Sequence, residues 1–255
     1  MTILAKWRGD GLTPGAWAAD STAGTGDTPM SSAGTVLSVD GSGPRSPRIK
    51  VAAETGATAY VFWGPAHLGK TLSAAAVRFY VEFTGIASAS WMLLSGWSGT
   101  TLNWKVDISG AGGSPPGQVR LRKGDNTQIA SSTVGLPLNT VVRIELLLAA
   151  DGTMSVYAYE GDSTTALFVV TGQLGFTPSY DIVRFGYNGV SPVVPAYYLD
   201  DLMVSDSPVL IGPEVKPPAP SVGWFLWDGT NEVPLNLEGV FDGAGIVPVT
   251  LDTLT

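Results

Sequence analysis

Hydrophobic and polar residues alternate with a period of two along much of the chain, which is the pattern of half-buried β-strands. The clearest case is 72–83, where Val77, Phe79 and Val81 share one face and charged or polar side chains share the other. Short strands separated by turns rich in glycine and proline predict an all-β, antiparallel β-sandwich. Further strands are predicted at 3–8, 35–40, 48–53, 58–63, 90–97, 102–109, 118–123, 127–132, 166–170, 182–188 and 197–205.

The segment 141–160 predicts a hairpin, because two runs of β-forming residues meet at Asp151-Gly152. A two-residue turn at this point places Leu146 on an apolar face. The same register places Arg143 opposite Glu160 as an exposed pair of opposite charge. We therefore expect a half-buried hairpin with Leu146 in the core and Arg143 at the surface.

A proline-rich segment, 208–220, separates the predicted sandwich at 1–207 from a tail at 221–255. Proline favours an extended, semi-rigid chain, so this segment is interpreted as a linker. The tail repeats itself: 226–238 and 240–252 each predict a short β-hairpin around an Asp-Gly turn. Such hairpins bury too little to be stable alone, so the tail is interpreted as an assembly element. Its predicted interface residues are Trp224, Trp227, Phe241, Val247 and Leu251.

Composition excludes several classes of protein. The 255 residues are 44% hydrophobic and 14% charged, with a formal net charge of −8. An acidic chain without a basic stripe is not expected to bind nucleic acid. No apolar run reaches the roughly 18 residues of a membrane span, so membrane insertion is not expected either. The chain has no cysteine, which excludes disulfides, thiolate metal sites and a cysteine nucleophile.

The first residues, MTILAKWRGDGLTPG, carry no recognisable signal peptide, so we expect synthesis in the cytoplasm of the producing cell. Little lysine and much glycine, serine, threonine and aromatic residue is nevertheless common in proteins that work outside cells. A virion component fits both features, because it is assembled inside the host and acts outside. A mature secreted protein whose signal has been removed is the alternative.

Four stretches carry a resemblance to concanavalin A-like jelly-roll domains of the laminin-G type: GDGLTPGAWAADSTAGTGD, TAYVFWG, VVRIELLLAADGTMSVYAYEGD and YYLDDLMVSD. More narrowly, the chain resembles jelly-roll modules in minor tail proteins of phages that infect actinobacteria, in which a similar WDGT…VP tail follows the sandwich. The resemblance implies a location in the virion tail, other tail proteins as partners, self-association, and a cell-surface glycan as a candidate ligand.

The acidic residues do not form a glycosidase motif. Glycoside hydrolases of this fold class carry Glu-x-Asp-x-x-Glu on one strand, and this spacing is missing. His67 is the only histidine, and no nucleophile-elbow motif accompanies it. We therefore expect no enzymatic activity and no cofactor.

Two sets of residues remain as candidate binding sites. Asp200 and Asp201 are candidate Ca²⁺ ligands, because Ca²⁺ favours carboxylate oxygens and relatives of this fold bind it; the alternative is a structural role. Trp91, Trp97 and Trp104 lie on neighbouring predicted strands and could stack on sugar rings, although β-sandwich cores also use tryptophan. Trp97 borders a turn and is expected to be the most exposed.

The sequence thus predicts a non-enzymatic phage tail protein with a lectin-like domain, which acts in tail structure, host-surface glycan binding or both. One alternative is a carbohydrate-binding module of a bacterial surface protein. A polysaccharide hydrolase is the enzymatic alternative.

Overall fold

The computed structural model describes residues 1–18, 22–24, 26–34, 37–42, 47–52, 58–187, 194–214, 225–227 and 232–234. The chain forms two compact units, 1–214 and 215–255. The first unit is a jelly-roll β-sandwich, so the predicted fold class is confirmed. No helix in the described residues is long and apolar enough to cross a membrane.

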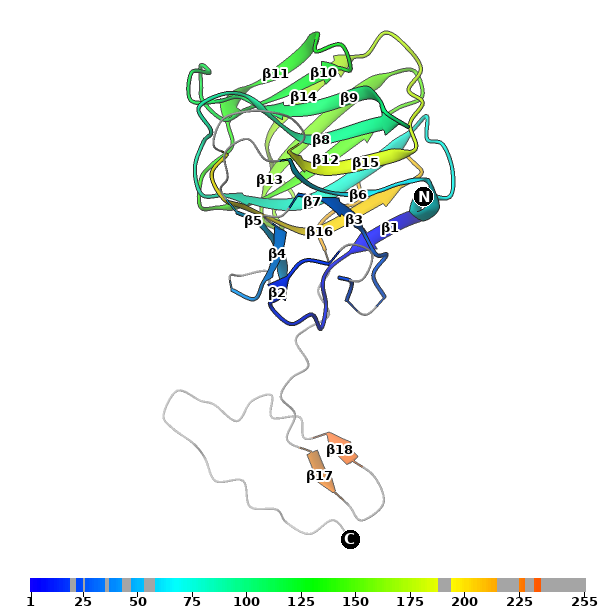
Figure 1. The fold of residues 1–255 in the computed structure, drawn as a ribbon, viewed down its shortest axis with the longest axis vertical. Coiled ribbons are helices and arrows are strands. Elements are labelled where there is room, and N and C mark those ends of the chain that lie inside the picture. The colour runs from blue at the N-terminus through cyan, green and yellow to red at the C-terminus, as the bar shows by residue number, and fades with distance from the viewer. Residues whose placement is uncertain are drawn as a thin grey trace. The chain divides into compact units, whose positions relative to one another are not determined.

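Two antiparallel sheets form the layers of the sandwich (Figure 1). In the described residues, the nine-stranded sheet runs β14 (Ala166–Gln173), β13 (Thr153–Glu160), β12 (Val141–Leu148), β7 (Ala75–Phe83), β16 (Tyr197–Ser205), β5 (Arg48–Val51), β4 (Leu37–Asp40) and β2 (Gly15–Ala16), with β1 (Ile3–Trp7) paired to β16. The seven-stranded sheet runs β11 (Gln128–Gly135), β10 (Gln118–Lys123), β9 (Thr101–Ile108), β8 (Trp91–Ser98), β15 (Ile182–Tyr187), β6 (Ala59–Trp63) and β3 (Ser31–Ala33). A short helix, α1 (Pro65–Leu68), precedes β7.

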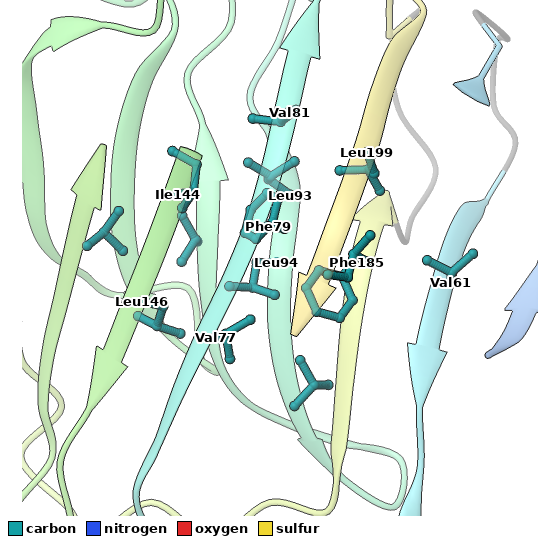
Figure 2. Packing of buried hydrophobic residues seen from close by; sticks show 14 of the residues in the cluster. Val61, Val77, Phe79, Val81, Leu93, Leu94, Ile144, Leu146, Phe185 and Leu199 are labelled. Atoms are coloured by element: carbon teal, nitrogen blue, oxygen red, sulfur yellow. The ribbon is translucent and has the colours of Figure 1, made fainter. Parts of the chain in front are cut away.

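The hydrophobic core lies between the two sheets and uses the inward positions of the alternating pattern. In β7 these positions are Val77, Phe79 and Val81, as the sequence predicts. Phe79 meets Phe185 of the opposite sheet edge-on, with ring centres 5.6 Å apart, so aromatic packing joins the layers. Figure 2 shows these side chains with Ile144, Leu146 and Leu199 of the nine-stranded sheet and Val61, Leu93 and Leu94 of the seven-stranded sheet.

The β12–β13 hairpin closes through a longer turn than the predicted one. The Ala149 N–H donates to the Thr153 carbonyl at 2.9 Å, and the Gly152 N–H donates to the Ala149 carbonyl at 2.9 Å. The loop is therefore 150–152, three residues instead of two. Gly152 has a φ of 86°, the left-handed conformation that ends a three-residue hairpin loop.

This longer loop shifts the register by one residue, so the predicted exposed pair of Arg143 with Glu160 is wrong. Arg143 lies opposite Tyr159 and is 2% exposed. Its Nε donates to Glu145 Oε1 at 2.9 Å, and Glu145 is 1% exposed. Leu146 is buried, as predicted. The charged side chains on the outward face of this hairpin are thus buried beneath another segment of the chain.

The cover is 206–214, which we call the C-terminal strap. The backbone N–H groups of Ile211 and Gly212 donate to Glu145 Oε2 at 2.7 and 3.1 Å. These bonds satisfy a carboxylate that would otherwise be buried at a large cost in free energy. The strap therefore belongs to the nine-stranded sheet's outer surface.

Glu214 ends the strap and is itself buried. Arg78 Nη2 donates to Glu214 Oε2 at 2.7 Å, and Arg8 forms a second ion pair with the same carboxylate. The compact unit consequently extends to 214, where the sequence predicted a sandwich ending at 207 and a linker over 208–220. The strap resembles a linker in sequence because it contains prolines, although its last residue, Glu214, is buried and anchors it.

The described part of the second unit is a pair of short antiparallel strands, β17 (Phe225–Trp227) and β18 (Glu232–Pro234). They lie where the first repeat unit predicts a hairpin. Trp227 falls in β17. The second repeat unit, 240–252, lies outside the described residues, as do Trp224, Phe241, Val247 and Leu251.

Candidate functional site

Trp91 and Trp104, two of the three tryptophans predicted to bind glycans, belong to the core. Trp104 is 0% exposed and meets the Tyr180 ring edge-on, with ring centres 5.3 Å apart. Trp91 is 4% exposed and packs against Phe83 and Tyr197. Neither ring can offer a face to a sugar, so this part of the prediction is wrong. Both residues occupy inward strand positions, which decides their burial.

Trp97 lies on the outer face of the seven-stranded sheet and is partly exposed. Its Nε1 donates a hydrogen bond to Ser95 Oγ at 2.8 Å, which fixes the indole over the sheet. Gly96 lies between them and faces the core, since a Cβ at this position would come within 2.3 Å of the Trp104 ring. Trp97 is thus the predicted tryptophan that reaches the surface.

Arg184 of β15 lies beside Trp97 and links it to two aromatic rings of β6. The guanidinium carbon is 4.1 Å from the ring centre of Trp97, 4.8 Å from that of Tyr60 and 5.9 Å from that of Phe62. All four side chains are partly exposed. We call these four residues the Arg184 platform. A cation held between aromatic faces is stabilised by their negative ring electrons.

Strand pairing explains why these side chains meet. Phe62 lies opposite Arg184, and Arg184 lies opposite Ser95, so the three occupy one row across β6, β15 and β8. Side chains in one row point to the same face of a sheet. Because the neighbouring residues Val61 and Val183 are in the core, the row faces outward.

The row continues across β9 and β10 as a group of charged residues. Ser95 lies opposite Lys105, and Lys105 lies opposite Arg122. Lys105 Nζ and Arg122 Nε both lie 3.0 Å from Asp107 Oδ2. Burial raises the pKa of the Asp107 carboxyl, while the charges of Lys105 and Arg122 act in the opposite direction. The cationic strip is our name for this group, which consists of Lys105, Asp107, Arg120 and Arg122.

A small hollow on the nine-stranded sheet is the other polar candidate. It is lined by Arg48, Tyr80, Glu82, Tyr198 and Asp200, among others. The Arg48 guanidinium lies 3.6 Å from the Tyr198 ring centre, and its Nη1 lies 2.5 Å from Glu82 Oε2. Its charge is therefore neutralised within the protein. The Arg184 platform is the better candidate because no carboxylate among the described residues pairs with Arg184.

Asp200 and Asp201, the predicted calcium ligands, form a β-bulge in β16. Asp201 has a φ of 47°, and its N–H donates to Asp200 Oδ1 at 2.8 Å. The bulge lies between the part of β16 that pairs with β5 and the part that pairs with β1. Among the described residues, no group of three or more His, Cys, Asp or Glu side chains could hold a metal ion. The hydrogen bond from the Asp201 N–H to Asp200 Oδ1 stabilises the bulge, which is a structural role for Asp200. Calcium binding by this doublet stays a prediction.

The side chains considered for catalysis have structural contacts. His67 Nδ1 accepts a hydrogen bond from the Gly64 N–H at 3.4 Å in the first turn of α1. Glu82 pairs with Arg48, and Glu145 is held by the strap. The prediction that the chain is not an enzyme stays a prediction.

Sequence reasoning missed three members of the platform: Tyr60, Phe62 and Arg184. A signal existed for Arg184, because its strand neighbours Val183 and Phe185 fit one inward face and leave it on the other. Tyr60 and Phe62 were hidden, since β6 is hydrophobic at every position and shows no alternation.

No protein-family model and no curated protein matches the sequence. Solved structures do match it, among them binding domains of botulinum neurotoxins. One is a structure of botulinum neurotoxin type C, whose cell entry is described as dependent upon interaction with two ganglioside molecules. It has 10% identity and a TM-score of 0.54, over 81% of this chain and 48% of that chain. A second is the binding domain of botulinum neurotoxin DC in complex with SialylT: 8% identity, TM-score 0.54, 81% of this chain and 48% of that chain.

A third is the binding domain of botulinum neurotoxin serotype G, with 9% identity and a TM-score of 0.54 over 82% of this chain and 49% of that chain. This chain spans about half the length of these structures. At such low identity the likeness concerns the path of the backbone. This chain therefore shares a β-sandwich fold with about half of each of these toxin binding domains.

Proposed function

We propose that the chain is a non-enzymatic glycan-binding protein whose binding surface is the Arg184 platform. The observation that carries this proposal is the Arg184 guanidinium, held 4.1 Å from the Trp97 ring centre and 4.8 Å from that of Tyr60 on an outer sheet face. The Arg184 platform thus combines aromatic ring faces with hydrogen-bond donors on one exposed surface.

Sugars need this combination. The C–H groups on one face of a pyranose ring pack on an aromatic ring, while the hydroxyl groups need polar partners beside it. Trp97 and Tyr60 supply ring surface, and Arg184 supplies a fork of N–H donors. Because Trp97 is held by Ser95, little conformational entropy is lost on binding.

The similar solved structures support the proposal at the level of fold. A ganglioside carries a saccharide headgroup, and one of the similar toxins is described through its interaction with two such molecules. This chain matches about half of that structure, so the ligand itself is carried over only as a proposal.

We further propose that this lectin-like domain works in a phage tail, where the second unit joins it to further copies or to other tail proteins. The sequence resemblance to minor tail proteins and the separate second unit support this role. A carbohydrate-binding module of a bacterial surface protein would have the same binding chemistry at another location. Electron microscopy of antibody-labelled phage particles distinguishes the two, since label on tails is expected here.

A glycan array tests the binding function. The intact protein should bind a subset of glycans, and Trp97→Ala should lose these signals. Trp17→Ala is the matched control, because Trp17 is also partly exposed but packs against Trp7 away from the platform. Absence of any signal, or equal loss in both variants, would refute the platform as a glycan site. Release of reducing sugar from a bound polysaccharide would refute the non-enzymatic part.

A further inference from the structure

We infer that the glycan ligand is acidic and that Arg184 binds its carboxylate or phosphate group. This inference rests on the proposed function and adds the charge of the ligand to it. Two independent features carry it: an arginine that has no anionic partner among the described residues, and an excess of positive charge on one sheet face.

Arg184 differs from most of the other described arginines. Five of them pair with carboxylates of the chain: Arg8 and Arg78 with Glu214, Arg48 with Asp40 and Glu82, Arg122 with Asp107, and Arg143 with Glu145.

Arg184 forms no such pair in the described residues, and its buried Nε has no hydrogen-bond partner there. The segment that follows β15, 188–193, contains no acidic residue that could supply one. Burial lowers the pKa of Arg184, with Tyr60 acting in the opposite direction, but a guanidinium stays charged at neutral pH. A partly buried cation that pairs with no carboxylate of the described residues is available to an external anion.

The face around Arg184 is positive although the protein is negative. The strands β6, β15, β8, β9 and β10 contain a single carboxylate, Asp107, and that carboxylate is buried between Lys105 and Arg122. Arg120, also on this face, donates to Ser90 Oγ at 3.2 Å and is not paired with an acid in the described residues. In a chain of net charge −8, such a local excess attracts anions to this face.

The chemistry also explains why a neutral sugar would be a poorer ligand. A carboxylate or phosphate can accept two parallel N–H bonds from a guanidinium, and these charge-assisted bonds are stronger than bonds to hydroxyl groups. A neutral sugar leaves the positive charge of Arg184 without a counterion when the site is covered. The platform should therefore bind an acidic sugar better than its neutral parent.

An array of matched pairs tests this inference. Each pair holds a neutral oligosaccharide and the same oligosaccharide bearing sialic acid, glucuronic acid or a phosphate ester, so the arms also identify the acidic group. The intact protein should prefer the acidic members, and added salt should weaken their binding. Arg184→Gln should weaken binding of the acidic hit by about tenfold or more and remove the preference.

Two further variants make the test decisive. Asp107→Asn removes the anion of the cationic strip and should strengthen acidic binding a few-fold. Lys50→Gln removes one positive charge from β5 of the other sheet and should leave the preference unchanged. Equal binding of acidic and neutral members, with binding still lost in Trp97→Ala, would overturn the inference but keep the proposed function. Absence of all glycan binding would overturn both.

Discussion

Trp97 and Trp104 come from paired neighbouring strands but lie on opposite faces of the seven-stranded sheet. Trp104, opposite Gly96 in the pairing, fills the space that the missing Gly96 side chain leaves in the core. Trp97, one residue further along β8, lies on the outer face, where its Nε1 donates a hydrogen bond to Ser95 Oγ. The same residue type thus serves the core at one position and an exposed surface at the other.

Alanine substitution should separate these two roles. Trp104→Ala is expected to lower the free energy of unfolding by about 3–5 kcal/mol, because it opens a large cavity beside Tyr180. Trp97→Ala should cost about 1 kcal/mol, since its ring is already partly in solvent. Urea unfolding of both variants measures the difference. Similar losses would mean that Trp97 is a core residue and the platform is not a surface.

The buried pair of Arg143 and Glu145 should be costly to break. Glu145→Ala leaves the Arg143 guanidinium buried without its counterion and removes the acceptor of two strap N–H groups. A loss of about 3–5 kcal/mol in the free energy of unfolding is expected. Glu160→Ala, at an exposed position of β13, is the matched control and should change stability by about 0.5 kcal/mol or less. Equal effects would contradict the role assigned to the strap.

Truncation should place the end of the folded unit after the strap. A chain of residues 1–214 keeps Glu214 for Arg78 and Arg8, so it should unfold cooperatively with nearly the stability of the intact protein. A chain of residues 1–207 loses Glu214 and the two donors to Glu145, and it should lose several kcal/mol, on the order of one broken buried ion pair.

The same 1–214 chain tests the assembly role of the second unit. Sedimentation equilibrium should find a smaller number of subunits for it than for the intact protein, because the apolar 215–255 segment is missing. An unchanged number of subunits would contradict assembly through this segment, and full stability of the 1–207 chain would contradict the strap as an anchor.

Buried tyrosines should limit stability at alkaline pH. Burial raises the pKa of both Tyr180 and Tyr197 in the folded chain above the value of about 10 of an unfolded tyrosine. Their contribution is fully present below about pH 10 and is lost as pH rises, by about 1.4 kcal/mol per pH unit for each residue. Urea unfolding across this range measures the slope.

Tyr180→Phe serves as the control for this pH dependence. The Tyr180 hydroxyl is buried and has no hydrogen-bond partner in the described residues, so its removal should cost little at neutral pH. The alkaline slope should fall by about half. An unchanged slope would show that Tyr180 does not contribute.

The sequence predicts the core better than the surface, and particular residues show why. Val77, Phe79 and Leu146 are recognisable because the alternation of their strands is regular. The predicted hairpin register is wrong because Asp151-Gly152 also fits a three-residue loop. The hydrogen bond from the Ala149 N–H to the Thr153 carbonyl closes this longer loop. The local sequence is compatible with either a two-residue or a three-residue loop.

Charged residues were the harder case. Arg143 and Glu145 resemble surface residues in their strand, and only the distant strap shows that they are buried. Its turn indicated that Trp97 would be the most exposed of Trp91, Trp97 and Trp104. Its partner Arg184 lies 87 positions later in the sequence and reaches it because β8 pairs with β15. The alternation of hydrophobic and polar residues does not specify which strands pair.

The central claim, that glycans bind at the Arg184 platform, is tested most directly by nuclear magnetic resonance of the side-chain N–H signals during titration with the strongest array ligand. Trp97→Phe and Arg184→Gln assign the relevant indole and guanidinium signals. The account predicts that the Trp97 Nε1–H and Arg184 Nε–H signals shift with saturation while that of Trp104, buried on the other side of the sheet, does not. Ligand-dependent shifts confined to other residues, with these two signals unchanged, would contradict it.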